Sequence, residues 1–172
     1  MRAVALTADG RLEVVDKPDP VPGLGEVVVA VERCGICGSD LHLKSWGMVP
    51  VGAVMGHEFA GTIAAVGAAA PAHLAEGQRV AVLPAARCGS CRPCRSNRDN
   101  LCELQPMTAI GLGVNDGAHA EYVRVPAAAC HPLPAGTAAE HGALVEPYAV
   151  ALHAVRRSAV ASVEAAATLT LG

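Results

Sequence analysis

Four closely spaced cysteines are the clearest chemical feature of the chain. Cys88, Cys91 and Cys94 are separated by two residues each, and Cys102 follows after a short polar loop. Four thiolates on so short a tether can surround one Zn²⁺ tetrahedrally and leave no vacant position. Such a closed site stabilises local structure and performs no reaction. The spacing predicts a structural zinc site, and free surface thiols or adventitious disulfides are the alternative.

A second group of metal-binding residue types is spread along the chain. It contains Cys37, the adjacent pair His57 and Glu58, and Glu146, which precedes a proline. A thiolate, an imidazole and a carboxylate suit Zn²⁺, and three protein ligands leave a fourth position free for water or substrate. This group predicts an open zinc site, with either Glu58 or Glu146 as the carboxylate ligand. Glu58 is also a candidate catalytic residue.

The residues around Cys37 could support chemistry at such a site. Zn²⁺ would polarise an alcohol oxygen and favour its ionisation near neutral pH. Ser39 and His42 supply a hydroxyl and an imidazole for a proton relay to solvent, and Asp40 could orient the His57 ring. Ser39 also has a simpler interpretation than a proton relay, since it could cap a short helix.

Two further interpretations of the second group compete with metal binding. Glu146 could be an ordinary carboxylate at a helix end, and His57 alone could be a hydrogen-bonded loop residue. Cys34 and Cys37 form a C-x-x-C pair, which suggests redox chemistry. No thioredoxin-like βαβ pattern surrounds this pair, so the sequence favours the metal site.

Composition limits the functional classes. The 172 residues are 52% hydrophobic and 17% charged, with a formal net charge of −3, which fits one domain or one domain plus the start of another. This charge gives no electrostatic case for nucleic acid or anionic membranes, and no apolar run is long enough to span a bilayer. Without a signal-peptide pattern at the N-terminus, we expect a cytoplasmic protein. Seven cysteines in a reducing compartment then favour metal binding over disulfides.

Most of the chain has the pattern of short strands. Apolar, β-branched or alternating segments bounded by glycine and proline predict strands at 12–15, 27–31, 57–67, 79–83 and 117–125, with a short helix around 40–45. After Pro134 the chain becomes rich in alanine and leucine. Thr137 is expected to cap a helix with Glu140 as capping-box partner, Pro147 to break or kink it, and Arg157 to end it. Residues 167–172 predict a buried strand.

Several segments together resemble the GroES-like catalytic half of the zinc-dependent medium-chain alcohol dehydrogenases. They occur in the family's order and cover nearly the whole chain, and the segment around Glu146-Pro147 is most similar to the polyol, butanediol and threonine dehydrogenase branch. The matching segments are 34–42, 56–63, 77–80, the cysteine lobe, 120–123 and 145–150.

This resemblance assigns roles to particular residues. It implies that Cys37 and His57 bind a catalytic zinc, with Glu58 or Glu146 completing the ligands, and that Ser39 occupies the family's relay position. His42 matches a relay position in some members only. The implied reaction is oxidation of a small alcohol or polyol, with hydride transfer from the zinc-polarised alcohol to NAD(P).

One departure from the family concerns the cofactor. The G-x-G-x-x-G loop of a Rossmann domain is missing, and the pair Gly111 and Gly113 lacks the third glycine and the following helix. We therefore expect a catalytic domain over 1–158 and the start of a truncated Rossmann domain over 159–172. NAD(P) would bind only the full-length parent, and the isolated chain would be inactive. Apolar surface uncovered in this way favours a homo-oligomer.

The combined prediction is a mainly β (α+β) fold, a GroES-like partial β-barrel with a zinc lobe and a trailing helix. The predicted function is that of a zinc-dependent, NAD(P)-linked alcohol or polyol dehydrogenase. A non-catalytic zinc-binding GroES-like module is the alternative. A GroES-like co-chaperone is disfavoured, because a chaperonin lid does not need a cluster of cysteine, histidine and glutamate.

Overall fold

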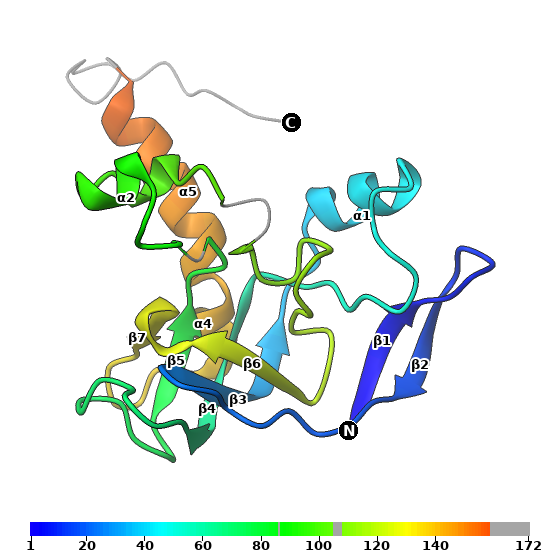
Figure 1. The fold of residues 1–172 in the computed structure, drawn as a ribbon, viewed down its shortest axis with the longest axis horizontal. Coiled ribbons are helices and arrows are strands. Elements are labelled where there is room, and N and C mark those ends of the chain that lie inside the picture. Colours follow the sequence, from blue (N-terminus) through cyan, green and yellow to red (C-terminus); the bar gives the residue numbers. More distant parts are fainter. Residues whose placement is uncertain (86, 105–107, 159–172) are drawn as a thin grey trace.

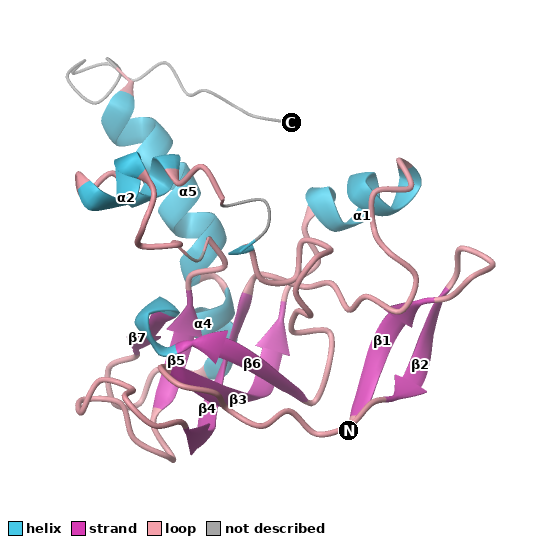
Figure 2. Cartoon of the chain, viewed as in Figure 1, coloured by secondary structure: helices cyan, strands magenta, loops and turns pink. Residues whose placement is uncertain are grey.

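A curved antiparallel sheet of five strands forms the centre of the molecule in the computed structural model, which describes residues 1–85, 87–104 and 108–158. The strand order is β6-β3-β4-β5-β7 (Figures 1 and 2). The strands are β3 (Glu26–Cys34), β4 (Phe59–Val66), β5 (Arg79–Val82), β6 (Tyr122–Pro126) and β7 (Cys130–Pro132). This mainly β arrangement with few helices confirms the predicted fold class.

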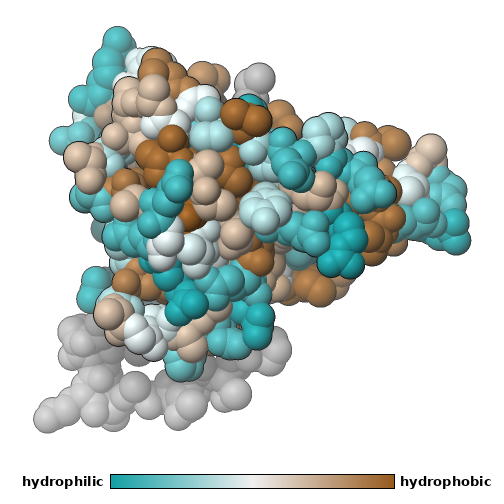
Figure 3. Space-filling view, turned by 90° about the horizontal axis from the view of Figure 1, so that it is seen from below, coloured by the Kyte–Doolittle hydropathy of each residue, from teal (hydrophilic) through white to brown (hydrophobic). Residues whose placement is uncertain are grey.

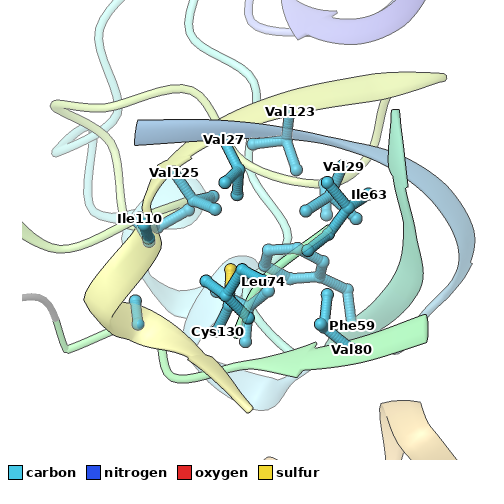
Figure 4. Packing of buried hydrophobic residues seen from close by; sticks show 14 residues of the cluster. Val27, Val29, Phe59, Ile63, Leu74, Val80, Ile110, Val123, Val125 and Cys130 are labelled. Atoms are coloured by element: carbon cyan, nitrogen blue, oxygen red, sulfur yellow. The ribbon is translucent and has the colours of Figure 1, made fainter. Parts of the chain in front are cut away.

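The sheet curves around the main hydrophobic cluster of the domain. Val27 and Val29 alternate along β3 and are fully buried, and Phe59 and Ile63 meet them from β4. Shifts in the β3–β4 register after Val28 and again after Val31 mark bulges, which bend strands. Figure 4 shows the strands curving around these side chains, with Leu74 and Cys130 filling the same interior. Cys130 is therefore a small core residue.

A separate hairpin packs beside this sheet. β1 (Arg2–Leu6) pairs with β2 (Leu12–Asp16), and the turn between them contains Gly10 with φ of 80°. Isolated bridges from Ala3 to Ala120 and from Ala5 to Val54 join β1 to the rest of the domain. The N-terminal strand therefore helps to hold the loop that precedes His57.

The helices lie mostly beyond one end of the sheet, where α1, α2 and α5 all appear in Figure 1. Helix α4 instead packs against β3, β4 and β5. The α-helices are α1 (Gly38–Ser45), α2 (Arg92–Arg95), α4 (Ala139–Ala143) and α5 (Val145–Arg157), and the short 3₁₀ helices are η1 (Asp99–Leu101) and η2 (Ala127–Ala129).

The predicted helix start at Thr137 is wrong. Helix α4 begins at Ala139, and its N-cap residue Ala138 makes no side-chain capping bond. The backbone carbonyl of Thr137 instead accepts a hydrogen bond from Arg79 Nη1 at 2.9 Å. The Thr137 carbonyl is therefore engaged outside the helix, and the N-cap lies one residue later than predicted, at Ala138.

The break near Pro147 is confirmed as two helical pieces, but it lies earlier than the proline. Helix α4 ends at Ala143 and α5 begins at Val145, which places Pro147 in the first turn of α5. Proline is tolerated there because first-turn N–H groups have no partner within the helix, whereas its ring would clash with a carbonyl four residues earlier in a continuous helix. Arg157 ends α5, as predicted.

None of the described helices is long and apolar enough to cross a membrane. On the face drawn in Figure 3, hydrophobic side chains lie in several groups among hydrophilic ones. The strand predicted at 167–172 and the domain predicted at 159–172 lie outside the described residues, so the boundary at residue 158 stays a prediction.

Substitution of a buried core residue tests the described fold directly. Ile63 is 1% exposed, so Ile63→Ala should lower the free energy of unfolding by about 2–5 kcal/mol through lost burial and a residual cavity. Val14→Ala on β2, where the side chain is 69% exposed, is the control and should change it by less than about 0.5 kcal/mol. Urea unfolding of both variants provides the measurement, and equal effects would contradict the described core.

Candidate metal centres and cavity

The four lobe cysteines converge in the structure. All their Sγ atoms lie within 4.8 Å of one another, with 3.9 Å between Cys88 and Cys94 and 4.0 Å between Cys91 and Cys102. A tetrahedron with Zn–S bonds of about 2.3 Å has S···S edges of about 3.8 Å. The four thiols are free, so the disulfide alternative is not realised. The lobe has the ligand set and the dimensions of a closed zinc site.

Local structure places these thiols. Helix α2 starts directly after Cys91 and carries Cys94 on its buried side. The N–H of Cys91 donates to Sγ of Cys88 at 3.3 Å, and the N–H of Cys88 donates to Sγ of Cys102 at 3.4 Å. Backbone N–H groups aimed at sulfur stabilise a thiolate. The lobe is thus prepared for negative charge on its sulfurs.

The thiols of the lobe differ in acidity. The Cys91 N–H and the Ser90 hydroxyl lower the pKa of Cys88 to about 6. Burial, together with neighbouring thiols such as Cys91, raises the pKa of Cys94 to about 12. Four thiolates cannot coexist here without a compensating cation, and a divalent metal ion supplies that charge.

The second ligand set also comes together, at the edge of the sheet where β3 ends and β4 begins. Ligand atoms of Cys37, His57 and Glu58 lie within 4.8 Å of one another. Cys37 is the N-cap residue of α1, and His57 and Glu58 immediately precede β4. Gly56, directly before His57, has a φ of 99°, and a Cβ there would lie 2.7 Å from His119 Cδ2 and 2.9 Å from Sγ of Cys34, so this position favours glycine.

Asp40 lies beside the His57 ring, next to its Nδ1 atom. Asp40 Oδ1 lies 3.4 Å from His57 Nδ1, and Asp40 Oδ2 accepts a hydrogen bond from the Cys37 N–H at 2.9 Å. The other ring nitrogen, Nε2, lies 3.3 Å from Ser39 Oγ. Both Asp40 and His57 are buried. Ligating histidines usually direct their second nitrogen at a carboxylate, so the contact of Nδ1 with Asp40 would leave Nε2 as the ligand atom.

Glu146 lies near this set without joining it. Among the described residues, the mutually close group contains Glu58 and not Glu146. Glu146 is half-buried in the first turn of α5 and lines the same cavity as His57. Burial raises the pKa of its carboxyl and the charge of Glu58 adds to this, whereas His57 acts in the opposite direction.

Cys34 does not behave as half of a redox pair. Burial, followed by the charges of Asp40 and Glu58, raises the pKa of the Cys34 thiol to about 12. Its Sγ donates to the Gly35 carbonyl at 3.4 Å. Because the thiolate is the reactive form, a protonated Cys34 argues against the redox interpretation.

A cavity of about 740 Å³ opens beside the second set. The predicted relay residues Ser39 and His42 both line it, together with His57 and Glu146. His42 lies one turn after Ser39 on α1, so the two side chains share a face of the helix. The cavity therefore brings Ser39, His42, His57 and Glu146 together, and Cys37 and Glu58 lie next to it through their closeness to His57.

Two residues near the site escaped the sequence analysis. His119 Nε2 lies 3.2 Å from the Gly35 carbonyl, a contact across 84 positions that no local pattern reveals. Trp46 lines the cavity and stacks on His42, with ring centroids 5.4 Å apart and an interplanar angle of 14°. Trp46 follows His42 by four residues at the end of a predicted helix, so the sequence could have indicated that the two rings are neighbours.

Known proteins share sequence with most of this chain. Residues 23–135 match the family model of the alcohol dehydrogenase GroES-like domain. An L-threonine 3-dehydrogenase of Coxiella burnetii is 39% identical over 142 residues, which are 79% of this chain and 40% of that protein. The L-galactonate-5-dehydrogenase of Escherichia coli K12 is 41% identical over 147 residues, which are 83% of this chain and 41% of that protein. The chain thus spans about two fifths of the length of these curated relatives.

Solved structures share the fold at similar identity. Galactitol-1-phosphate dehydrogenase from Escherichia coli has a TM-score of 0.83 and 32% identity, over 94% of this chain and 45% of that one. Acetophenone reductase from Geotrichum candidum, solved in complex with NAD, has a TM-score of 0.73 and 36% identity, over 83% of this chain and 42% of that one.

The cysteine lobe yields a test of its metal. Cys88→Ser should reduce bound zinc by one ion per chain and lower the free energy of unfolding by at least about 2 kcal/mol, because metal binding is coupled to folding of the lobe. Cys130→Ala, a buried cysteine outside both sets, is the control and should keep its zinc. Metal analysis by mass spectrometry and urea unfolding give the readouts, and full zinc retention by Cys88→Ser would contradict the assignment.

The His57–Asp40 contact predicts a pH dependence in the metal-free protein. Burial lowers the pKa of His57, but the contacts with Asp40 and Cys37 outweigh it and raise that pKa from 6.5 to about 9. The folded state therefore binds this proton more tightly, and the stabilisation is complete below pH 6.5 and lost as the pH rises to about 9.

Urea unfolding of the chelated, reduced protein across this range measures the effect. Asp40→Asn should flatten the decline, since it removes the negative partner. An unchanged slope in Asp40→Asn would show that the His57 proton is not held by this contact.

Proposed function

Because the chain belongs to the alcohol dehydrogenase GroES-like domain family, we propose that it is the zinc-binding catalytic part of a dehydrogenase that oxidises an alcohol or polyol with NAD(P). The convergence of Cys37, His57 and Glu58 carries this proposal, together with the cavity that His57 lines. The names of the relatives support it, since they are dehydrogenases of hydroxylated substrates and a reductase solved with NAD.

Three side chains would hold the catalytic ion. Cys37 Sγ, a ring nitrogen of His57 and a carboxylate oxygen of Glu58 form the compact set, and this mixture of donors suits Zn²⁺ with one open position. Zn²⁺ at this position supplies Lewis acidity, which lowers the pKa of an alcohol oxygen. Glu146 stays beside the set as a second carboxylate. Cys88, Cys91, Cys94 and Cys102 would hold a structural zinc.

Ser39 and His42 would move the proton of the substrate hydroxyl. Ser39 Oγ is next to His57 at the inner end of the cavity, where it can accept that proton. His42 is exposed at the cavity edge, so it can pass the proton from Ser39 to solvent. Asp40 takes no proton in this scheme and serves to fix the His57 ring.

The cofactor would be bound by another part of the dehydrogenase. The chain contains no G-x-G-x-x-G segment, whereas the relatives are more than twice as long as the region they share with it. We also propose a cytoplasmic homo-oligomer. No side chain of α5 is buried in the single chain, and Tyr148 and Val150 are largely exposed, which favours self-association.

Metal substitution tests the open site. The purified chain should bind two Co²⁺ or Zn²⁺ ions, and Cys37→Ser should bind one while the lobe keeps its own. Cobalt absorption distinguishes the sites, because the lobe supplies four thiolates and the second set only one. Cys34→Ser is the matched control and should retain both ions. Equal metal content in Cys37→Ser and the unaltered chain would refute the assignment.

Nicotinamide-dependent chemistry separates this proposal from a non-catalytic zinc module. If the cofactor is held elsewhere, the 172-residue chain alone should show neither saturable NAD(P) binding nor alcohol-dependent NADH formation. The complete dehydrogenase carrying this domain should form NADH, and its Cys37→Ser variant should not. Activity that survives Cys37→Ser would favour the structural role.

A further inference from the structure

The cavity beside the candidate catalytic set has two chemically different regions. Its polar groups are Ser39, His42, His57 and Glu146. At least two of these gather at one place, because Ser39 Oγ lies 3.3 Å from His57 Nε2 and Glu146 is close enough to His57 for their charges to interact. The rest of the wall is apolar. It is formed by Leu43, Trp46, Pro84, Ala85, Ala109 and Leu112.

The apolar wall is assembled from three separate parts of the chain. Leu43 and Trp46 come from α1 and the residue after it, Pro84 and Ala85 follow β5, and Ala109 and Leu112 lie in the loop before β6. Pro84 and Ala109 are buried, so this surface is supported from behind by the packed domain. A wall of this kind offers apolar contact area, and the indole N–H of Trp46 is the single side-chain hydrogen-bond donor among these six residues.

Charge gives the cavity a second selective property. No lysine or arginine lines it within the described part of the chain, and its one carboxylate among the lining residues belongs to Glu146. Away from the metal ligands, a substrate carboxylate or phosphate would therefore meet apolar groups and the negative charge of Glu146. Burying an unpaired charge against such a wall is unfavourable.

Trp46 extends the apolar wall to the cavity edge. The ring lies nearly parallel to His42 at 5.4 Å, and it is 68% exposed. A flat aromatic surface placed beside the relay histidine can pack against the hydrocarbon part of a substrate whose hydroxyl points to Ser39.

We propose that this site selects a neutral alcohol with an apolar body, such as an aryl or cycloalkyl alcohol, over polyols that carry a carboxylate or phosphate. The proposal rests on the dehydrogenase function proposed above. It separates this chain from relatives whose names specify L-galactonate and galactitol 1-phosphate. The hydroxyl would lie at the polar end, and the apolar body would lie along Leu43, Leu112 and Trp46.

Tryptophan fluorescence reads this binding directly, because Trp46 is the single tryptophan of the chain. The zinc-loaded chain is titrated with 1-phenylethanol and, separately, with galactonate. We expect a saturable change in emission with 1-phenylethanol and at least about tenfold weaker binding of galactonate. This comparison uses the unaltered protein and so needs no variant to fold.

A charge placed in the wall should reverse the preference. Leu112→Arg should weaken 1-phenylethanol binding and strengthen galactonate binding, each by about tenfold, because it adds the missing cationic partner. Val114→Arg is the matched control. It carries the same charge two residues away, where the side chain is exposed and lines a different cavity, and should leave both affinities unchanged.

The outcomes separate this inference from the function on which it rests. Equal or tighter binding of galactonate by the unaltered chain would overturn the substrate class, and so would no response to 1-phenylethanol while two zinc ions are bound. If the unaltered chain binds no metal ion at Cys37, the proposed function is refuted, and this inference is refuted with it. An equal effect of Leu112→Arg and Val114→Arg would show that the cavity wall does not set the preference.

Discussion

The register between β3 and β4 is the constraint on which the candidate catalytic site depends. Cys34 at the end of β3 pairs with Phe59 at the start of β4, and the Gly35 N–H donates to the Glu58 carbonyl at 2.7 Å. The chain segments that carry Cys37 and His57 therefore leave the sheet at the same edge. A shift of one residue would turn each side chain to the opposite face. The buried Phe59 ring opposes such a shift. Packing of the core therefore fixes the register, and the register fixes the positions of the ligands.

This dependence explains which features could be predicted from the sequence. The cysteine lobe was accessible because its ligands lie on one short tether, whose length alone limits their separation. The strands were accessible from alternating apolar residues, although their pairing was not. The second ligand set was predicted from its residue types and from resemblance to a family, because its members are too far apart in sequence for spacing alone to show their closeness. His119 could not be found, since its contact with Gly35 exists only in the folded sheet. Thr137 had the side chain of a helix cap, but its carbonyl accepts a hydrogen bond from Arg79 and the N-cap of α4 is Ala138.

The two ligand sets differ in the groups that surround their ligand atoms. In the lobe, backbone N–H groups point at sulfur, and the four ligands are all of one kind. In the second set a thiol, an imidazole and a carboxylate meet, and Asp40 lies behind the imidazole. The first arrangement is complete without further partners. The second leaves room on the cavity side, where Ser39 and Glu146 approach, so only the second can admit a substrate.

In helix α1, the same side chain contributes to helix capping and to the geometry of the candidate metal site. The Asp40 carboxylate accepts the Cys37 N–H at the start of the helix with one oxygen and faces His57 with the other. Helix capping, placement of the Cys37 thiol and orientation of the imidazole therefore share a single side chain. The same helix carries Ser39 and His42 toward the cavity, and Trp46 follows at its end. Because Ser39 and His42 share this helix with Leu43, and Trp46 follows directly after it, helical geometry fixes the spacing between the polar residues and this part of the apolar wall.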